Sequence, residues 1–304
     1  MRNSPDIICV GDIMVEHLVY LPSLPRPDTT IILDSYQQQI GGPAFNVCWH
    51  LTQLGHKPRL VGPFGKHDSA LISETFSAAK MASTGLVPVE GDTDRLFAFL
   101  NDDHHHSVYF RATLPQDVSS QIATLCERPS CLVLFGSRHR MLRELYISLL
   151  NKFSGALVVF NPSYAIYEYS QKELEELLGK YHVTIVNEQE AAHICQIFGL
   201  RDMSHLSKLS PGPVIVTLGE KGAKIFHHEA FFEIESFSTT RLQLIGAGDA
   251  FIAGFIHETL RGALLADAVR FGSHVAAQVV ESSKIRVEIR EEEIRTKIAR
   301  LMNS

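Results

Sequence analysis

The sequence predicts an α/β protein built on a largely parallel sheet, and two features lead to this class. Short runs that are apolar throughout end in Gly or Asn, and an amphipathic stretch follows each of them. The runs are DIICVGD, PRLVGPFG, SCLVLFG, ALVVFNPS, VTIVNEQEA and PVIVTLG. Strands read this way when helices cover both faces of a parallel sheet, so each run is expected to be a buried strand.

Two other segments, at about residues 13–40 and 90–112, alternate β-forming residues with polar ones. We expect them to pair as a small antiparallel sheet beside the main one. A small half-apolar sheet is not stable alone, so it should close over a ligand or pack on a second copy of the chain. At the C-terminus, Ile294, Ile298 and Leu301 recur at helical spacing behind an acidic turn, which predicts a final amphipathic helix.

Length, composition and charge restrict the functional classes. The 304 residues, 45% of them hydrophobic, suit one large domain over residues 1–304. A net charge of −6 and scattered basic residues argue against nucleic-acid binding. The five cysteines are odd in number and set in apolar runs, which indicates reduced thiols. Without a run of about 18 apolar residues, no membrane span is expected, and we predict a cytoplasmic protein.

The stretch LQLIGAGDAFIAGF carries the clearest chemical signal. Gly246 and Gly248 allow close approach of a ligand to the backbone, and a helix opening at Ala247 would direct its free N–H groups at an anion. Asp249 could accept a proton from a hydroxyl lying beside that anion. Taken alone, the tetrapeptide favours a helix start with a dipole-favoured acid and small residues for packing.

Six motifs occur in a fixed order, namely IGGPAFNVCWHLTQLG, VGPFGKHD, NPS, VNEQEA, VTLGEKGA and GAGDAF. Over almost the entire chain their order and spacing resemble the ribokinase-like, or PfkB, carbohydrate kinases. This resemblance implies a three-layer α/β/α domain with a mostly parallel central sheet, covered by a small β lid at residues 13–40 and 90–112. It also implies an ATP- and Mg²⁺-dependent kinase acting on a hydroxymethyl group of a sugar or sugar-like molecule. The half-apolar lid segments themselves predict a homodimer formed through the lid. A nucleoside kinase of the same fold and a degenerate, ligand-binding pseudokinase are the alternatives.

The resemblance also assigns roles to residues. Asp249 is the expected base, and the backbone of Gly246, Ala247 and Gly248 the expected anion hole. The residues expected to bind the acceptor are Asp12, Glu16, Gly41, Gly42, Asn46 and Arg111. On the nucleotide side they are Asn187, Thr217, Gly219, Gly222 and His274, with Glu190 as the metal-side carboxylate.

Each assignment has a structural alternative. Gly41 and Gly42 could form only a turn before a helix. Glu16 stands where the family carries an aspartate, and it could instead be an exposed strand residue. Asn187 and Glu190 have the spacing of a capping box. Arg111 could be a solvated strand residue. The DDHHHS segment (102–107) could suggest a metal site, but consecutive histidines on an alternating segment point to opposite faces, which favours a polar lid tip. GSRHR (136–140) is expected to be a basic loop after a buried strand.

The segment before GAGD departs from the family pattern. Gln243, Leu244 and Ile245 stand where the family usually has Asp-Thr-Thr, and the later segment VVESSKIRVEI lacks the usual glycine. In the resembling kinases these two segments commonly hold a monovalent cation. A glutamine oxygen supplies no negative charge, so two supports of that cation site are weakened together.

We therefore predict that activity does not depend on potassium, because packing of Leu244 and Ile245 would support the anion hole instead. Initial rates in sodium, potassium and tetramethylammonium buffers of equal ionic strength test this prediction. Activation by several-fold that is specific to potassium would contradict it.

Overall fold

The computed structural model describes residues 6–21, 28, 30–33, 36–100, 105–112, 114, 117–153, 155–180, 183–228, 230–235, 245–282 and 284–302. Its centre is a nine-stranded sheet of order β13-β12-β11-β10-β9-β8-β1-β4-β5. Most strands of this sheet run parallel to one another, namely β1 (Ile7–Val10), β4 (Arg59–Gly65), β5 (Leu86–Val89), β8 (Cys131–Phe135), β9 (Leu157–Asn161), β10 (Val183–Asn187) and β11 (Val214–Thr217). The antiparallel strands β12 (Ala223–His227) and β13 (Ala230–Ile234) complete one edge. The predicted, mostly parallel sheet is confirmed.

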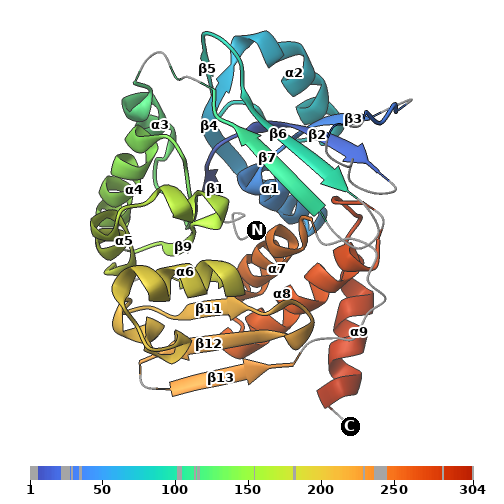
Figure 1. Cartoon of the computed structure of the whole chain (residues 1–304). Coiled ribbons are helices and arrows are strands. Elements are labelled where there is room, and N and C mark those ends of the chain that lie inside the picture. The colour runs from blue at the N-terminus through green and yellow to red at the C-terminus, as the bar shows by residue number, and fades with distance from the viewer. Residues whose placement is uncertain are drawn as a thin grey trace.

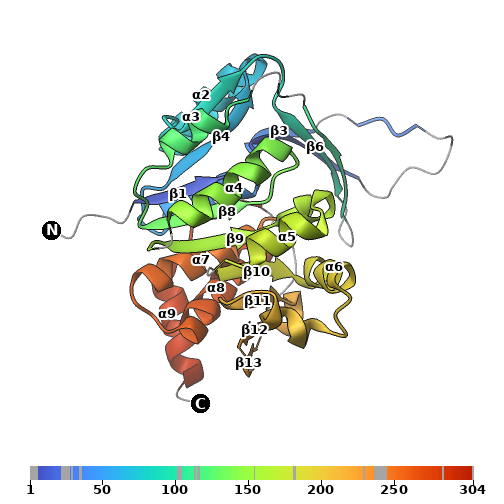
Figure 2. The same cartoon turned by 90° about the vertical axis from the view of Figure 1, so that its left-hand side faces the viewer.

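Helices cover both faces of this sheet, as its apolar strands require. Along β1, Ile7 and Cys9 enter one apolar core and Ile8 and Val10 enter the other. The first core contains α1 (Pro43–Gln53), α2 (Ser69–Ala78), α7 (Ala247–Leu260), α8 (Leu265–Val280) and part of α9 (Glu291–Met302). The second contains α3 (Ser119–Leu125), α4 (Arg140–Lys152), α5 (Gln171–Leu178) and α6 (Glu188–Phe198). Figure 2 shows the three resulting layers edge on.

Short 3₁₀ helices lie in several connections, at η1 (Lys66–Asp68), η2 (Ser163–Glu168), η3 (Met203–Lys208) and η4 (Gly219–Lys221). Two glycines bring α7 and α8 close together. A Cβ on Gly254 would lie 2.9 Å from the Cα of Gly272, so neither position has room for a larger side chain without a shift. This close contact fixes the direction in which α7 leaves the sheet.

A second, four-stranded sheet of order β3-β2-β6-β7 forms the lid, and it lies over the upper part of the molecule in Figure 1. It consists of β2 (Met14–Tyr20), β3 (Gln37–Gly41), β6 (Asp94–Leu100) and β7 (His105–Phe110), which match the two predicted segments except that β3 extends one residue further. The β2–β3 and β6–β7 pairs are antiparallel as expected, whereas the central pair β2–β6 is parallel. Parallel pairing follows because β2 and β6 belong to different segments that both leave the main sheet in the same direction.

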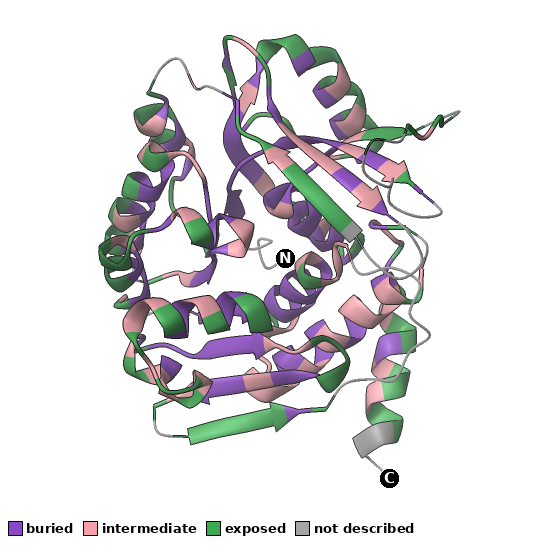
Figure 3. Cartoon of the chain, viewed as in Figure 1, coloured by how far each residue is buried: buried purple, intermediate pink, exposed green. Residues whose placement is uncertain are grey.

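One lid face is covered and the other presents apolar side chains. Glu16, Leu18 and Ala98 are buried, whereas Val108 and Phe110 are each 58% exposed. Figure 3 shows the exposed outer strand β7 in green. The five cysteines are buried and free, as predicted. Across the described ranges, every helix is too short or too polar to cross a bilayer.

Candidate active site

The N-terminus of α7 forms the proposed anion cradle. Gly246 precedes the helix in a left-handed conformation, with φ of 84°, and a Cβ there would lie 2.7 Å from Cγ2 of Ile285. Glycine is therefore required at this turn by both the backbone and the space. A Cβ on Gly248, by contrast, would meet open space. The first N–H groups of a helix have no intrahelical partner, so this accessible turn can receive an anion.

A second helix N-terminus faces the first across the site. Gly42, with φ of 100°, precedes α1, and its carbonyl accepts a hydrogen bond from the backbone N–H of Asn46 at 3.0 Å. The Asn46 side chain is buried and donates from Nδ2 to Oδ2 of Asp249 at 2.8 Å. The glycine pair and GAGD motifs, about 200 residues apart in sequence, therefore meet through one side-chain contact.

The surroundings of Asp249 make its carboxyl group unusually basic. Burial, together with the negative charges of Glu16 and Glu190, raises the pKa of Asp249 to about 7, against the opposing effects of the Asn46 hydrogen bond and of Arg286. A carboxyl group with this pKa is basic enough to accept a proton near neutral pH. The influence of Glu190 also places the predicted metal-side carboxylate within electrostatic reach of the predicted base.

Glu16 is buried at 3% exposure, so an exposed strand residue is the wrong interpretation for it. Its Oε1 accepts the backbone N–H of Gly42 at 3.0 Å, and its Oε2 accepts Nε2 of Gln39 at 2.8 Å. A Cβ on Gly41 would lie 2.0 Å from the Glu16 carboxyl carbon, which explains the first glycine of the pair. The longer carboxylate is thus folded back onto the glycine turn, and its contact with an acceptor stays a prediction.

Asn187 and Glu190 form the capping box that their spacing allows. Oδ1 of Asn187 accepts the Glu190 N–H at 2.8 Å, and Oε2 of Glu190 accepts the Asn187 N–H at 3.0 Å. The box uses one carboxylate oxygen of Glu190. Burial raises the pKa of this carboxyl group to about 7. Capping and a metal-side role are therefore compatible, because the second oxygen is not needed for the box.

The end of β11 lies beside this capping box. Thr217 pairs in register with Asn187, and the turn that follows closes through a 2.7 Å bond from the Leu218 N–H to the Gly222 carbonyl. Gly219 and Gly222 both have positive φ, of 60° and 86°. The residues predicted for the nucleotide side therefore lie together at the carboxyl ends of the neighbouring strands β10 and β11.

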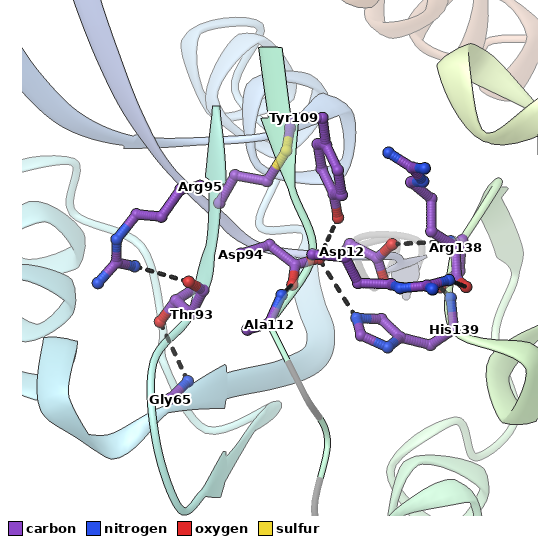
Figure 4. A network of polar contacts seen from close by, with 12 residues as sticks. Asp12, Gly65, Thr93, Asp94, Arg95, Tyr109, Ala112, Arg138 and His139 are labelled. Carbon is purple, nitrogen blue, oxygen red and sulfur yellow. Dashed lines mark hydrogen bonds and ion pairs between the residues drawn. The ribbon is translucent and has the colours of Figure 1, made fainter. Parts of the chain in front are cut away.

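Asp12 belongs to a different polar cluster, which joins the lid to the loop after β8 (Figure 4). Its carboxylate accepts Oγ of Ser137 at 2.7 Å and the backbone N–H of Arg138 at 3.3 Å. Asp94, at the start of β6, accepts Tyr109 Oη and contacts Nε2 of His139 at 3.3 Å. Burial raises the pKa of Asp12 to about 6. The GSRHR segment, expected to be a simple basic loop, thus supplies the contacts that join the loop after β8 to the lid.

Ligand atoms of Asp12, Asp94 and His139 lie within 4.8 Å of one another, a spacing that a metal ion could use. However, the hydroxyl and backbone donors of the cluster already occupy the carboxylates. The pKa of His139 is raised, despite the opposing effect of burial, by the hydrogen bond and charge of Asp94 and by Asp12. Because Asp12 bonds to the loop after β8 and Asp94 contacts His139 of the same loop, the cluster joins the lid to that loop.

The remaining predicted residues lie apart from the Asn46–Asp249 contact. Arg111 donates from Nη1 to the Arg138 carbonyl at 3.0 Å and lies 3.9 Å from Glu168, so it is tied to the loop after β8 and is not simply solvated. His274 is 3% exposed on α8, where burial and the charges of Lys297 and Arg270 lower its pKa to about 4. Its predicted contact with a nucleotide stays a prediction.

Several sequence expectations fall on residues that the structure leaves undescribed. Gln243 and Leu244 lie outside the described residues, as do 102–104 of the DDHHHS segment. Ile245 is described, and it packs with Leu18, Ala98, Leu100 and Ile285. One important residue was missed: Arg286 reaches the Asn46–Asp249 contact from a segment noted only for lacking a glycine. No local motif marks it, since the contact joins residues 240 positions apart.

Comparisons with known proteins agree with this geometry. Residues 4–290 match the model of the pfkB family carbohydrate kinases. A nucleoside kinase of Methanothermobacter thermautotrophicus is 25% identical, covering 95% of this chain and 94% of the relative. A ribokinase of Haemophilus influenzae is 23% identical over 91% and 92% of the two chains.

Solved structures share the fold. The nucleoside kinase of Methanocaldococcus jannaschii superposes with a TM-score of 0.82 at 19% identity, covering 97% of this chain and 98% of that one. The nucleoside kinase of Burkholderia thailandensis in complex with inosine also has a TM-score of 0.82, at 17% identity, over 98% and 99% of the chains. The ribokinase-like α/β architecture with a lid is therefore established.

Asp249→Asn should become more stable relative to the wild type as the pH rises from about 4 to about 7. The folded pKa of Asp249, about 7, exceeds the ordinary value of 3.8, so over this window the unfolded chain is ionised while the folded carboxyl stays protonated. The wild type consequently loses stability with rising pH, and the amide variant escapes this loss. Urea unfolding across the window measures the difference.

Asp267→Asn provides a matched control, because Asp267 also lies in the first turn of a helix but is half exposed. Its effect should change little over the same window. A stability difference between wild type and Asp249→Asn that is equally flat would show that the Asp249 carboxyl is not basic.

Proposed function

Because the chain belongs to the pfkB family of carbohydrate kinases, we propose that it transfers the γ-phosphoryl group of ATP to a hydroxymethyl group of a sugar or nucleoside. The observation that carries this proposal is the contact between Asn46 and Asp249, 2.8 Å long, at the open N-terminus of α7. It combines a basic carboxyl group with an anion-binding turn at one place. Proton acceptance and phosphoryl stabilisation need that combination.

In the proposed reaction, Asp249 takes the proton of the acceptor hydroxyl. The acceptor oxygen forms a bond to the γ-phosphorus as the bond from that phosphorus to the ADP oxygen breaks, and the products are a phosphate monoester and ADP. The N–H groups of Ala247, Gly248 and Asp249 would stabilise the charge on the transferred group. Most of the rate would come from positioning and electrostatics, since phosphoryl transfer requires little covalent help from the protein.

Glu190 and Asn187 would serve the nucleotide side. Mg²⁺, when bound with ATP, would supply positive charge to the phosphates, and it takes few protein oxygens because it keeps several waters. The second oxygen of Glu190 suits such a water-mediated contact. Thr217, Gly219 and Gly222 would line the phosphate side at the end of β11, where the positive φ of both glycines lets the backbone approach a ligand.

The acceptor could be a free sugar or a nucleoside. A ribose hydroxymethyl group is common to free sugars and nucleosides, so the same base and anion hole serve both. The nucleoside class is favoured by the relatives and solved structures that carry that name, among them one in complex with inosine. A coupled ADP-release screen over sugars and nucleosides distinguishes the classes, and acceptor binding without ADP release would indicate a pseudokinase.

The lid would also form a homodimer interface. Tyr20, Val108 and Phe110 on its strands, and Ile32 and Tyr36 between β2 and β3, are apolar side chains with 47–89% exposure. Patches of this kind are typical of protein interfaces.

Asp249→Ala should lower kcat by about 10²–10⁴-fold, the usual contribution of a general base. The affinities for ATP and acceptor should stay within a few-fold, because the helix N-terminus and Asn46 remain. Steady-state kinetics and calorimetric binding measure the two effects, and a melting temperature reports folding. Near-native turnover would contradict the role as base, and a variant that cannot fold would favour the helix-start interpretation.

Light scattering should detect a dimer at micromolar concentration, and Phe110→Glu should shift it toward monomer. Phe231→Glu is the matched control, since Phe231 is equally exposed at 58% but lies on β13 of the main sheet. A wild-type protein that stays monomeric at high micromolar concentration would contradict the lid interface.

A further inference from the structure

Arg286 extends from the segment between α8 and α9 into the interior of the site. Its side chain is only 13% exposed, and its guanidinium lies over the rings of Phe45 and Trp49 at 4.6 and 5.9 Å from their centroids. The polar contacts are all with residues far away in sequence. Nε donates to Oδ1 of Asn46 at 3.1 Å, and Nη2 donates to the carbonyl of Ile40 and lies 3.9 Å from Oε2 of Glu16.

We propose that Arg286 is a positioning residue for the proposed phosphoryl transfer: it orients the Asn46 amide toward Asp249 and fixes the strand end that leads into the Gly41–Gly42 turn. This inference rests on the proposed function, and it adds a residue that the ordered motifs do not contain. Arg286 would not touch the reacting atoms. It would act through Asn46, whose side chain stands between the guanidinium and the base.

The orientation follows from the donors and acceptors. An asparagine amide has an oxygen that only accepts and a nitrogen that only donates. Because Arg286 can only donate, it must face Oδ1, and this directs Nδ2 to the Asp249 carboxylate, as the two bonds of 3.1 and 2.8 Å require. A flipped amide would place two donors together at Arg286 and two acceptors together at Asp249. Arg286 thus excludes the flipped state, and the bond from Asn46 to Oδ2 leaves Oδ1 of Asp249 as the oxygen available to a proton.

The guanidinium also supplies charge to an acidic site. The carboxylates of Glu16, from β2, and Glu190, from α6, both raise the pKa of Asp249, whereas Arg286 lowers it. Glu16 and Asp249 in turn oppose the lowering effect of burial on the pKa of Arg286 itself. Burial lowers the pKa of the neighbouring His50 to about 4, and the charge of Arg286 adds to that shift. A lysine would retain the charge, but it cannot present the planar fork that bonds Asn46 and Ile40 together.

Three variants separate orientation from charge. Arg286→Met removes both, Arg286→Lys keeps the charge, and Lys284→Met removes an exposed positive charge from the same segment as a control. In Arg286→Met the acid limb of the pH profile of kcat/KM should move up by about one unit, with a loss of about tenfold on that limb. Arg286→Lys should keep the wild-type midpoint but lose several-fold in kcat, since the amide is no longer held. Lys284→Met should match the wild type in both.

A double-mutant cycle with Asn46→Ala tests whether Arg286 acts through Asn46. If it does, adding Arg286→Lys to Asn46→Ala should lower kcat by less than it does in the wild-type background. Equal losses in the two backgrounds, or a wild-type pH profile in Arg286→Met, would overturn the proposal. Melting temperatures accompany each variant, and the lysine variant decides the outcome if the methionine variant does not fold.

A measurement independent of turnover keeps this inference separate from the proposed reaction. In ¹⁵N-labelled protein, the side-chain NH₂ resonance of Asn46 should shift with the ionisation of Asp249, with a midpoint near its pKa of about 7. Arg286→Met should raise that midpoint, and Lys284→Met should not. An unchanged midpoint in Arg286→Met would overturn the positioning role even in an active enzyme, whereas a raised midpoint in a protein without kinase activity would support the role and reject the proposed function.

Discussion

The contact between the N-termini of α1 and α7 is the constraint on which the rest of the site depends. Each helix begins after a glycine with positive φ, so each exposes its first N–H groups to the same region. Joining the two starts through Asn46 and Asp249 fixes a carboxylate beside an anion-binding turn. The close packing of α7 on α8 at Gly254 and Gly272 supports this placement, because it leaves α7 little freedom to tilt.

The joined helix starts bring the carboxylates of Glu16, Glu190 and Asp249 close together, and the nearby positive charges only partly offset this negative charge. The positive end of a helix dipole lowers the pKa of a nearby acid, typically by an energy of about 0.3–1 kcal/mol. For Asp249, burial and two neighbouring carboxylates outweigh that effect, so the net shift is upward, to about 7. Arg286 moderates the shift without abolishing it. A base that stays partly protonated near neutrality follows from this balance, and so does the cost in stability of burying it.

The sequence predicted the main-sheet strands β1, β4, β8, β9, β10 and β11 and both lid segments, because each depends on local pattern, but it did not predict β5, β12 or β13. Ordered motifs also marked the GAGD, glycine-pair and NEQEA residues as candidate site residues. It also predicted the capping box of Asn187 and Glu190 as an alternative, and the structure shows that this box forms beside Thr217, another residue predicted for the nucleotide side. Other features needed the three-dimensional fold. The burial of Glu16 depends on the Gly41 turn across the strand pair, and Arg286 depends on a contact over 240 positions. The parallel β2–β6 pairing depends on where both strands leave the main sheet.

The two ends of the lid are held by different forces, and this difference bears on how it could move. Near the start of β6, directional polar contacts anchor it: Arg95 binds Asp68 at 2.9 Å, and Asp94 contacts His139. Toward the other end, Leu18 and Leu100 form an apolar cluster with Ile245 and Ile285. Apolar contact is non-directional and tolerates sliding, whereas hydrogen bonds weaken steeply when they are misaligned. Motion of the lid would therefore pivot at the polar end and shift the apolar end, which includes Ile245, the residue next to Gly246. Because Ile285 also packs against Gly246, a lid displacement would be transmitted to the anion cradle by direct contact.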